Sequence, residues 1–185
     1  RTRELQVSNA QIEARAAELA VINSIQQGMA AALTFQDIVD LVGDKLREVF
    51  GSQDLGINLK DAHADLMHRA YLYEHGNRLH LESWWPKPGT RIQRVFDTLV
   101  AGRPVVQNNR SDTDAWQIPT EPGTDEAKSI VLVPIACGDR FVGVIGLEDH
   151  QRENAFGEAE VRLLTTIAAS MGVALENARL FEETQ

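Results

Sequence analysis

The chain has 185 residues, which suits a single domain with an added helical segment better than two complete domains. Hydrophobic residues make up 43% and charged residues 24% of the sequence, so its composition is that of a folded protein and excludes general disorder. The 27 acidic residues outnumber the 18 basic ones, and the net charge of −9 argues against nucleic acid or an anionic membrane surface as the main partner.

Cysteine content and hydropathy further limit the kinds of site and the cellular locations that fit this sequence. The single cysteine, Cys137, cannot form a disulfide within the chain or supply a zinc site built from several cysteines. No run of about 18 apolar residues predicts a membrane span, and no signal peptide is recognisable. We therefore expect a cytoplasmic location. The sequence begins with arginine instead of methionine, which indicates a piece of a longer protein.

Residues 4–33 have the pattern of a long helix that needs a partner. Leucine or isoleucine recurs every seven residues at its start, a spacing that keeps one stripe of a helix against a second helix in a coiled coil. The apolar spacing then tightens, as expected where a helix packs on its own domain. A frayed chain end is the alternative. We predict a helical linker over 1–18 and a homodimer held by the N- and C-terminal helices through Leu5, Ile12, Leu19, Ile22 and Leu175.

Helical periodicity predicts further helices from Thr34 to Gly51, over 92–100, and from Gly157 to the end of the chain. Residues 84–91 and 107–127 are rich in proline, glycine and polar residues, and we expect loops there.

Alternating or continuous apolar runs predict the strands, which are 55–59, a hairpin over 66–83, a brief strand at 105–106, and a hairpin of 129–136 with 140–148. The last hairpin is apolar at nearly every position, so both of its faces should be covered. Pro134 should lie at an edge or bulge, and Gly143 and Gly146 where another backbone or a ligand approaches closely.

Three segments near the C-terminus resemble one known family. Residues 129–135 read Ser-Ile-Val-Leu-Val-Pro-Ile, 143–147 read Gly-Val-Ile-Gly-Leu, and 174–181 read Ala-Leu-Glu-Asn-Ala-Arg-Leu-Phe. They resemble the C-terminal half of GAF domains, which are small-molecule sensor modules of bacterial signalling proteins such as sensor histidine kinases of two-component systems and nucleotide cyclases. Residues 102–109 resemble the helix-to-strand segment of the same family.

This resemblance implies a GAF domain over 19–181, with the start of a linker helix at 182–185. It implies an α+β fold, an α/β/α sandwich, whose central antiparallel sheet has about five or six strands and whose long N- and C-terminal helices lie on one face. In GAF domains the segments that match the two predicted loops line a ligand pocket. The resemblance thus implies an unknown small-molecule ligand held by Trp84, Trp85, Arg91, Arg94, Asn108, Asp112 and Trp116. The alternative is that the tryptophans only anchor the loops on the sheet.

This sequence lacks residues on which several activities of the family depend. Cyclic-nucleotide binding uses an Asn-Lys pair and Phe-x-x-x-Asp-Glu, whereas Phe156 is followed by Gly-Glu-Ala-Glu-Val and no Asn-Lys pair occurs. Cys137 lies far from the usual bilin attachment region. Reduction of methionine sulfoxide uses several cysteines, and a lone Cys137 cannot complete that thiol exchange by itself.

Neither a catalytic group nor a metal site is expected. The chain has no Gly-x-Ser-x-Gly motif, and no nucleophile and base can be placed together. In the predicted hairpin, His68 and His80 should lie too far apart to share a metal. We expect surface or strand-edge positions for the histidines, and a single haem-binding histidine stays open. The five are His63, His68, His75, His80 and His150.

We therefore expect a non-catalytic regulatory module that dimerises through its terminal helices and relays a small-molecule or conformational signal. Its output domain, of the kinase or cyclase type, would lie outside this chain. One alternative is a degenerate GAF module that binds no ligand and serves only dimerisation and transmission. The other is a redox enzyme of the methionine-sulfoxide-reductase type.

Overall fold

The computed structural model describes residues 1–51, 54–120, 122 and 124–183. A six-stranded sheet in the order β3-β2-β1-β6-β5-β4 forms its centre, and every paired neighbour runs antiparallel. The strands are β1 (Leu55–Lys60), β2 (Met67–Glu74), β3 (Asn77–Arg78), β4 (Val105–Gln107), β5 (Ser129–Cys137) and β6 (Arg140–Asp149). The predicted α+β fold with an antiparallel sheet is confirmed.

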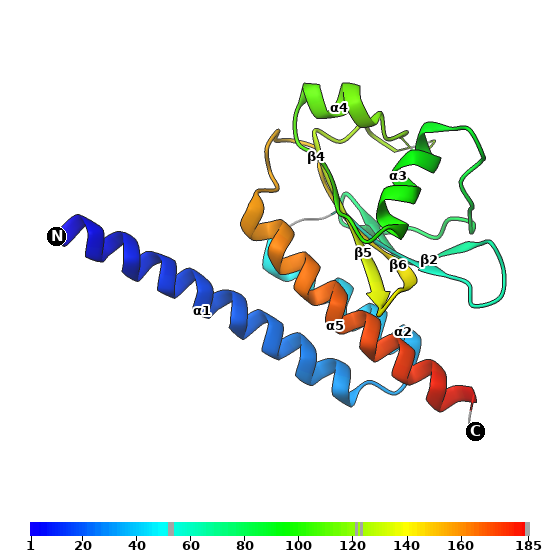
Figure 1. The fold of residues 1–185 in the computed structure, drawn as a ribbon, viewed down its shortest axis with the longest axis horizontal. Helices are drawn as coiled ribbons and strands as arrows, with labels where there is room; N and C mark the ends of the chain where they lie inside the picture. The colour runs from blue at the N-terminus through cyan, green and yellow to red at the C-terminus, as the bar shows by residue number, and fades with distance from the viewer. Residues whose placement is uncertain (52–53, 121, 123, 184–185) are drawn as a thin grey trace.

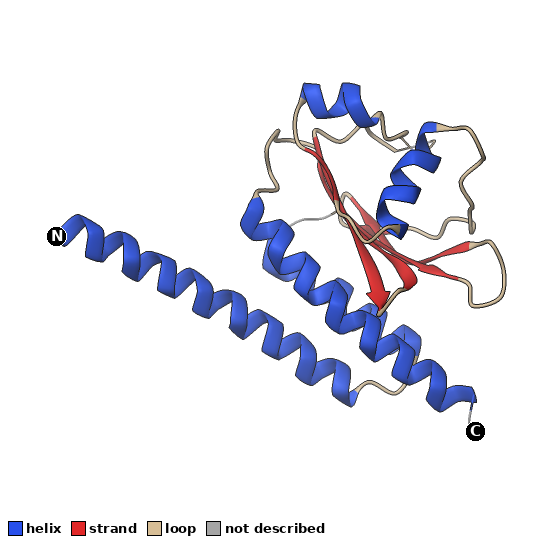
Figure 2. Ribbon diagram, in the orientation of Figure 1, coloured by secondary structure: helices blue, strands red, loops and turns tan. Residues whose placement is uncertain are grey.

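Helices cover both faces of this sheet, as Figures 1 and 2 show. The long helices α1 and α5 lie side by side on one face together with α2, while α3 stands over the other face. The Thr34 hydroxyl accepts a hydrogen bond from the Asp37 amide and so caps α2, which ends at Gly51 with φ 60°. The helices are α1 (Thr2–Ala31), α2 (Phe35–Phe50), α3 (Arg91–Val100), α4 (Arg110–Trp116) and α5 (Glu158–Glu183).

One prediction about local structure holds in part and one is wrong. The hairpin expected over 66–83 forms, with Tyr73 opposite Arg78 and Met67 opposite Trp84 in the same register, but its second arm is a regular strand only at Asn77–Arg78. Residues 79–83 run beside β2 without regular strand pairing, and the Leu79 amide donates to the Leu72 carbonyl at 2.8 Å. The loop expected over 107–127 contains α4, whose first turn is capped by the Asn109 side chain accepting from the Asp112 amide at 3.0 Å. Helix α4 is short and polar, so it lacks the apolar periodicity by which longer helices are recognised in a sequence.

Alternation along β5 separates two hydrophobic cores. Val131, Val133 and Ile135 are fully buried in the core beneath α1, α2 and α5. Leu132, between them, packs on the opposite face with the core around α3. Pro134 lies beyond the end of β4, which pairs only with 130–132, so its missing N–H costs no bond to that strand. Both faces of the strand are covered, as the continuous apolar run predicts.

Close approaches explain the two strand glycines. A Cβ atom at Gly143 would overlap the backbone carbonyl of Asn58, and one at Gly146 would lie 2.9 Å from the side chain of Leu132. The expectation of a close backbone is confirmed at Gly143, whereas at Gly146 the close group is a side chain and the nearest backbone atom is 3.9 Å away.

The first part of α1 projects away from the rest of the molecule (Figure 1). Leu5, Ile12 and Leu19 are 63%, 63% and 59% exposed, and the buried residues of α1 are Ile25 and Met29. Glu18 of α1 pairs with Arg162 of α5 at 2.8 Å, which holds the two helices parallel where the helix reaches the domain.

Two further expectations concern the C-terminal helix. Leu175 is 1% exposed and packs in the domain's own core. The expectation that it contacts a second protomer is therefore wrong. The predicted linker start at 182–185 falls partly on residues 184 and 185, which lie outside the described residues. Over the part of the chain that is described, no helix is both long and apolar enough to cross a membrane.

The contact between α5 and β5 generates a stability prediction at Gly172. A Cβ atom there would overlap the backbone carbonyl of Ala136, which cannot rotate aside because it belongs to the sheet. We expect Gly172→Ala to lower the free energy of unfolding by about 1–3 kcal/mol, since overpacking outweighs alanine's better helix propensity. Urea denaturation followed by circular dichroism measures this. The control Thr165→Ala, on the exposed side of α5, should change stability by less than about 0.5 kcal/mol, and an equal effect of both variants would contradict the prediction.

A candidate ligand cavity with an acidic end

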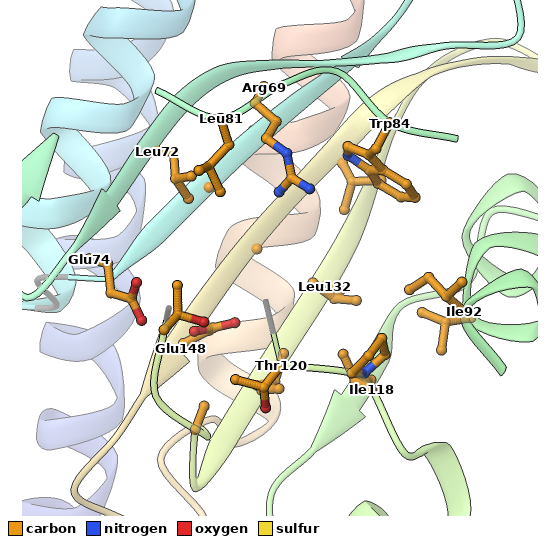
Figure 3. Close-up of a pocket in the computed structure, with 18 of the residues that line it drawn as sticks. Arg69, Leu72, Glu74, Leu81, Trp84, Ile92, Ile118, Thr120, Leu132 and Glu148 are labelled. Atoms are coloured by element: carbon orange, nitrogen blue, oxygen red, sulfur yellow. The ribbon is translucent and has the colours of Figure 1, made fainter. Parts of the chain in front are cut away.

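A cavity of about 710 Å³ lies between the sheet and α3. Its floor is formed by β1, β5 and β6, and Leu132, Val144 and Gly146 point into it or border it. The segment that follows β3 beside β2 supplies one wall through Leu79 and Leu81, of which Figure 3 labels Leu81. The volume and mostly apolar lining are those of a site for a small organic molecule.

Aromatic side chains close the α3 side of the cavity. Phe96 of α3 is packed edge-on by Trp84, Trp85 and Phe141, with ring centroids 6.2, 5.0 and 5.6 Å away. The indole N–H of Trp84 donates to the Asn58 side chain at 3.1 Å, which fixes the ring. Both tryptophans therefore act as rigid walls and also anchor the loop on the sheet.

The polar groups of the cavity lie at separate places. Arg69 of β2 directs its guanidinium into the cavity, while Glu74 and Glu148 lie together at another end (Figure 3). Burial raises the pKa of Glu148; His150 partly opposes this shift, and the carboxylates of Glu74 and Asp54 add to it. The cavity thus has a basic group facing an apolar interior and an acidic end where negative charges crowd one another.

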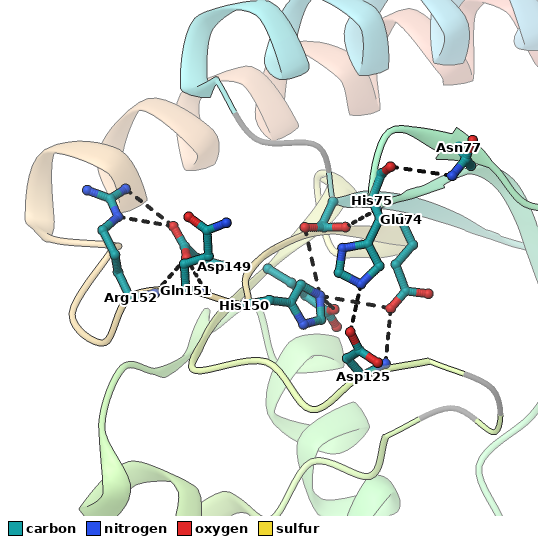
Figure 4. A network of polar contacts seen from close by, with 10 residues as sticks. Glu74, His75, Asn77, Asp125, Asp149, His150, Gln151 and Arg152 are labelled. Atoms are coloured by element: carbon teal, nitrogen blue, oxygen red, sulfur yellow. Dashed lines mark hydrogen bonds and ion pairs between the residues drawn. The ribbon is translucent and has the colours of Figure 1, made fainter.

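Beyond this acidic end the rings of His75 and His150 contact each other in a tilted arrangement, with centroids 4.9 Å apart and planes at 44°. His75 bonds to Asp125 through Nε2 at 2.9 Å, and its backbone N–H donates to Asp54 at 2.6 Å (Figure 4). The side chain of His150 is only 9% exposed, so the expected surface or strand-edge position is wrong for this histidine.

The structure separates the seven predicted pocket residues. Trp84 and Trp85 line the cavity, whereas the other five do not. Arg94 donates to the carbonyl of Ala115 and lies over the ring of Trp116 at 4.8 Å, so this pair ties α3 to α4. The side chains outside the lining are Arg91, Arg94, Asn108, Asp112 and Trp116.

Two of those five residues instead join the β4 end to α5. The Asn108 side chain donates to the Phe156 carbonyl at 2.6 Å and accepts from the Phe156 amide at 3.2 Å. Asp112 accepts from the Asn108 amide at 2.8 Å. Because Phe156 lies two residues before α5 begins at Glu158, this pair of bonds connects the end of β4 to the start of the C-terminal helix.

Sequence reasoning missed the residues that only the sheet order brings together. Arg69 and Glu74 come from β2, Gln107 from β4 and Glu148 from β6, and all four line the cavity. The strands β3-β2-β1 meet the strands β6-β5-β4 only through the pairing of β1 with β6, which are far apart in the sequence. Gln107 is 3% exposed, and the sequence does not reveal the burial of this polar side chain.

Comparison with known proteins agrees with this architecture. A family model described as GAF domain matches residues 32–176, so the chain belongs to the GAF domain family, whose members are regulatory and sensor modules of signalling proteins. The chain is 23% identical over 173 residues to the formate hydrogenlyase transcriptional activator of Salmonella typhimurium strain SL1344. That match covers 88% of this chain and 24% of the activator, so the chain spans about a quarter of that protein's length.

Solved structures share the fold at lower identity. The GAF domain of an Acinetobacter phosphoenolpyruvate-protein phosphotransferase has a TM-score of 0.71 and 18% identity, over 89% of this chain and 95% of that one. The free methionine-R-sulfoxide reductase of Neisseria meningitidis, solved with its substrate, has a TM-score of 0.69 and 21% identity, over 89% and 92%.

The bonds of Asn108 to Phe156 generate a prediction about the start of α5. Asn108→Ala removes a donor and an acceptor from a partly buried backbone, and we expect it to cost about 1–3 kcal/mol. Amide hydrogen exchange at residues 156–161 should become faster. Asn109→Ala, which removes only the cap of α4, is the comparison and should leave these amides protected. Unchanged exchange in Asn108→Ala would show that the bonds do not hold α5.

Proposed function

We propose that this GAF domain is a non-catalytic sensor that binds an organic ligand in the cavity and relays its presence through α5. The observation that carries the proposal is the apolar cavity of about 710 Å³ with the Arg69 guanidinium directed into it. An apolar interior with few polar groups supports binding of an aromatic or aliphatic molecule that carries an anionic group for Arg69.

Strand β5 lies directly between the cavity and α5. Ile130 and Leu132 face the cavity, while the alternate residues Val131 and Val133 pack against the helical side of the sheet. A ligand that moves β5 or the Asn108–Phe156 connection therefore displaces α5. It shifts the domain between two arrangements only if it binds them with different affinities.

We propose that the domain acts as a homodimer, in addition to binding a ligand. The exposed stripe of Leu5, Ile12 and Leu19 offers a partner helix the coiled-coil spacing, and an apolar groove runs between α1 and α5. The output domain belongs to the longer protein. A kinase, a cyclase or, by similarity to the Salmonella protein, a transcriptional activator fits this arrangement.

A reductase function finds less support. The sole cysteine, Cys137, is half-buried at the β5–β6 turn and is not among the residues that line the cavity. The degenerate module without a ligand remains the competing proposal, and it is decided by a binding experiment.

The cavity is tested with 8-anilinonaphthalene-1-sulfonate, an aromatic anion whose fluorescence rises in apolar sites. We expect saturable binding that Leu132→Trp weakens at least about tenfold by filling the space, and that Arg69→Gln weakens by about 1.5–3 kcal/mol through loss of a charge-assisted bond. Val100→Trp, on an exposed position of α3 that is 47% accessible, is the matched control. If Leu132→Trp and Val100→Trp bind the dye equally well, the cavity is not the site and the degenerate module is favoured.

Sedimentation velocity tests the dimer. We expect the chain to be dimeric, and the double variant Leu5→Glu with Ile12→Glu to be monomeric because it buries charge in the proposed seam. Ala10→Glu with Ala17→Glu adds the same charge at exposed positions outside the stripe and should stay dimeric. A monomeric parent chain, or dissociation of both variants alike, would refute the proposed interface.

A further inference from the structure

Histidine and carboxylate side chains converge where three strand ends meet. Since β1 is antiparallel to both β2 and β6, its start lies beside the ends of those two strands, with Leu55 opposite Tyr73 and Leu147. The topology thereby gathers residues from positions far apart in the sequence (Figure 4). They are Asp54 before β1, Glu74 and His75 at the end of β2, and Glu148 and His150 at the end of β6.

The distances around His150 are unlike those of ordinary hydrogen bonds. Its Nε2 atom lies 3.4 Å from Glu148 Oε2, 3.8 Å from Asp54 Oδ2 and 3.9 Å from Glu74 Oε1. Hydrogen bonds of this type span about 2.7–3.2 Å. The His150 side chain is 9% exposed, and among the described residues neither of its ring nitrogens has a hydrogen-bond partner. A buried imidazole without such a partner, turned toward carboxylates, points to a ligand between them.

We propose that Glu74, His75 and His150 form a binding site for a divalent transition-metal ion, with Glu148 and Asp54 beside it. One ligand atom from each of the first three residues lies within 4.8 Å of the others. Metal bonds of about 2.0–2.2 Å place neighbouring ligand atoms about 3–3.5 Å apart, so a small inward movement of the side chains completes the coordination.

The donor set selects the class of metal. Two imidazoles with carboxylate oxygens suit Zn²⁺ and similar ions, whereas Ca²⁺ and Mg²⁺ take oxygen ligands. Asp125 accepts a hydrogen bond from His75, as carboxylates commonly do beside metal-bound histidines. A cation would also offset the repulsion among the crowded carboxylates, which burial otherwise makes costly.

The site adds a second input to the domain and is separate from the organic ligand of the proposed function. Glu74 and Glu148 also line the cavity, so a bound metal ion would stand at its acidic end. It would fasten the β2–β3 turn to the end of β6, from which the chain continues toward α5. The two proposals rest on different groups, Arg69 with the apolar lining for the organic ligand and His75 with His150 for the metal ion, so different probes test them and failure of one leaves the other in place.

The test uses the full chain, stripped with a chelator and titrated with Zn²⁺ by calorimetry and with Co²⁺ by visible absorption. We expect one metal ion per chain, a higher unfolding temperature with Zn²⁺ that EDTA reverses, and a Co²⁺ spectrum with nitrogen and oxygen ligands. Absence of saturable binding of either metal would overturn the site.

Variants assign the binding to the named residues. His150→Gln, His75→Gln and Glu74→Gln should each weaken Zn²⁺ binding at least about tenfold. The His75 side chain is 52% exposed, so its variant should fold as the parent does, and metal-free unfolding temperatures verify this. His63→Gln changes an exposed histidine in the β1–β2 connection and is the matched control. Binding that survives in His75→Gln and His150→Gln, or falls equally in His63→Gln, would refute the assignment.

Discussion

The two-sided burial of the β5–β6 hairpin is the constraint on which the rest of the molecule depends. Side chains alternate across a strand, so Val131, Val133 and Ile145 pack against the helices while Leu132 and Val144 face α3 and the cavity. A slip of one residue would exchange these sets and leave neither face able to pack. The hairpin is therefore both the floor of the cavity and the support of α5.

This shared support makes the GAF domain suited to relaying a signal. Gly172 lets α5 approach the β5 backbone more closely than any larger residue allows, and Asn108 bonds to Phe156, two residues before α5 begins. Closely packed interiors transmit strain because side chains have little room to relax. In the proposed function, this contact carries a change on the cavity face to α5.

At the acidic end of the cavity, ionisable side chains are buried together at the ends of strands, and this burial costs free energy. Burial and like charges raise the pKa of Glu148, and the His150 imidazole lies 3.4 Å from its carboxylate, tilted at 44° to the ring of His75. Bringing these groups together costs desolvation energy. The metal ion that we propose at this end of the sheet would offset that cost.

Periodicity in the sequence determined most of the elements of this protein: the helices α2, α3 and α5 and the β5–β6 hairpin follow from short-range patterns that local packing requires, and the GAF resemblance rests on short segments of the same kind. Tertiary structure alone decided the rest. The order β2-β1-β6 brings Glu74 to Glu148 and His75 to His150, and the segment 79–83 beside β2 places Leu79 and Leu81 in the cavity wall. Asn108 and Asp112 serve as connectors because their partners lie far along the chain or depend on a short polar helix. Contacts between distant segments have no period in the sequence, so only the folded sheet reveals which side chains meet.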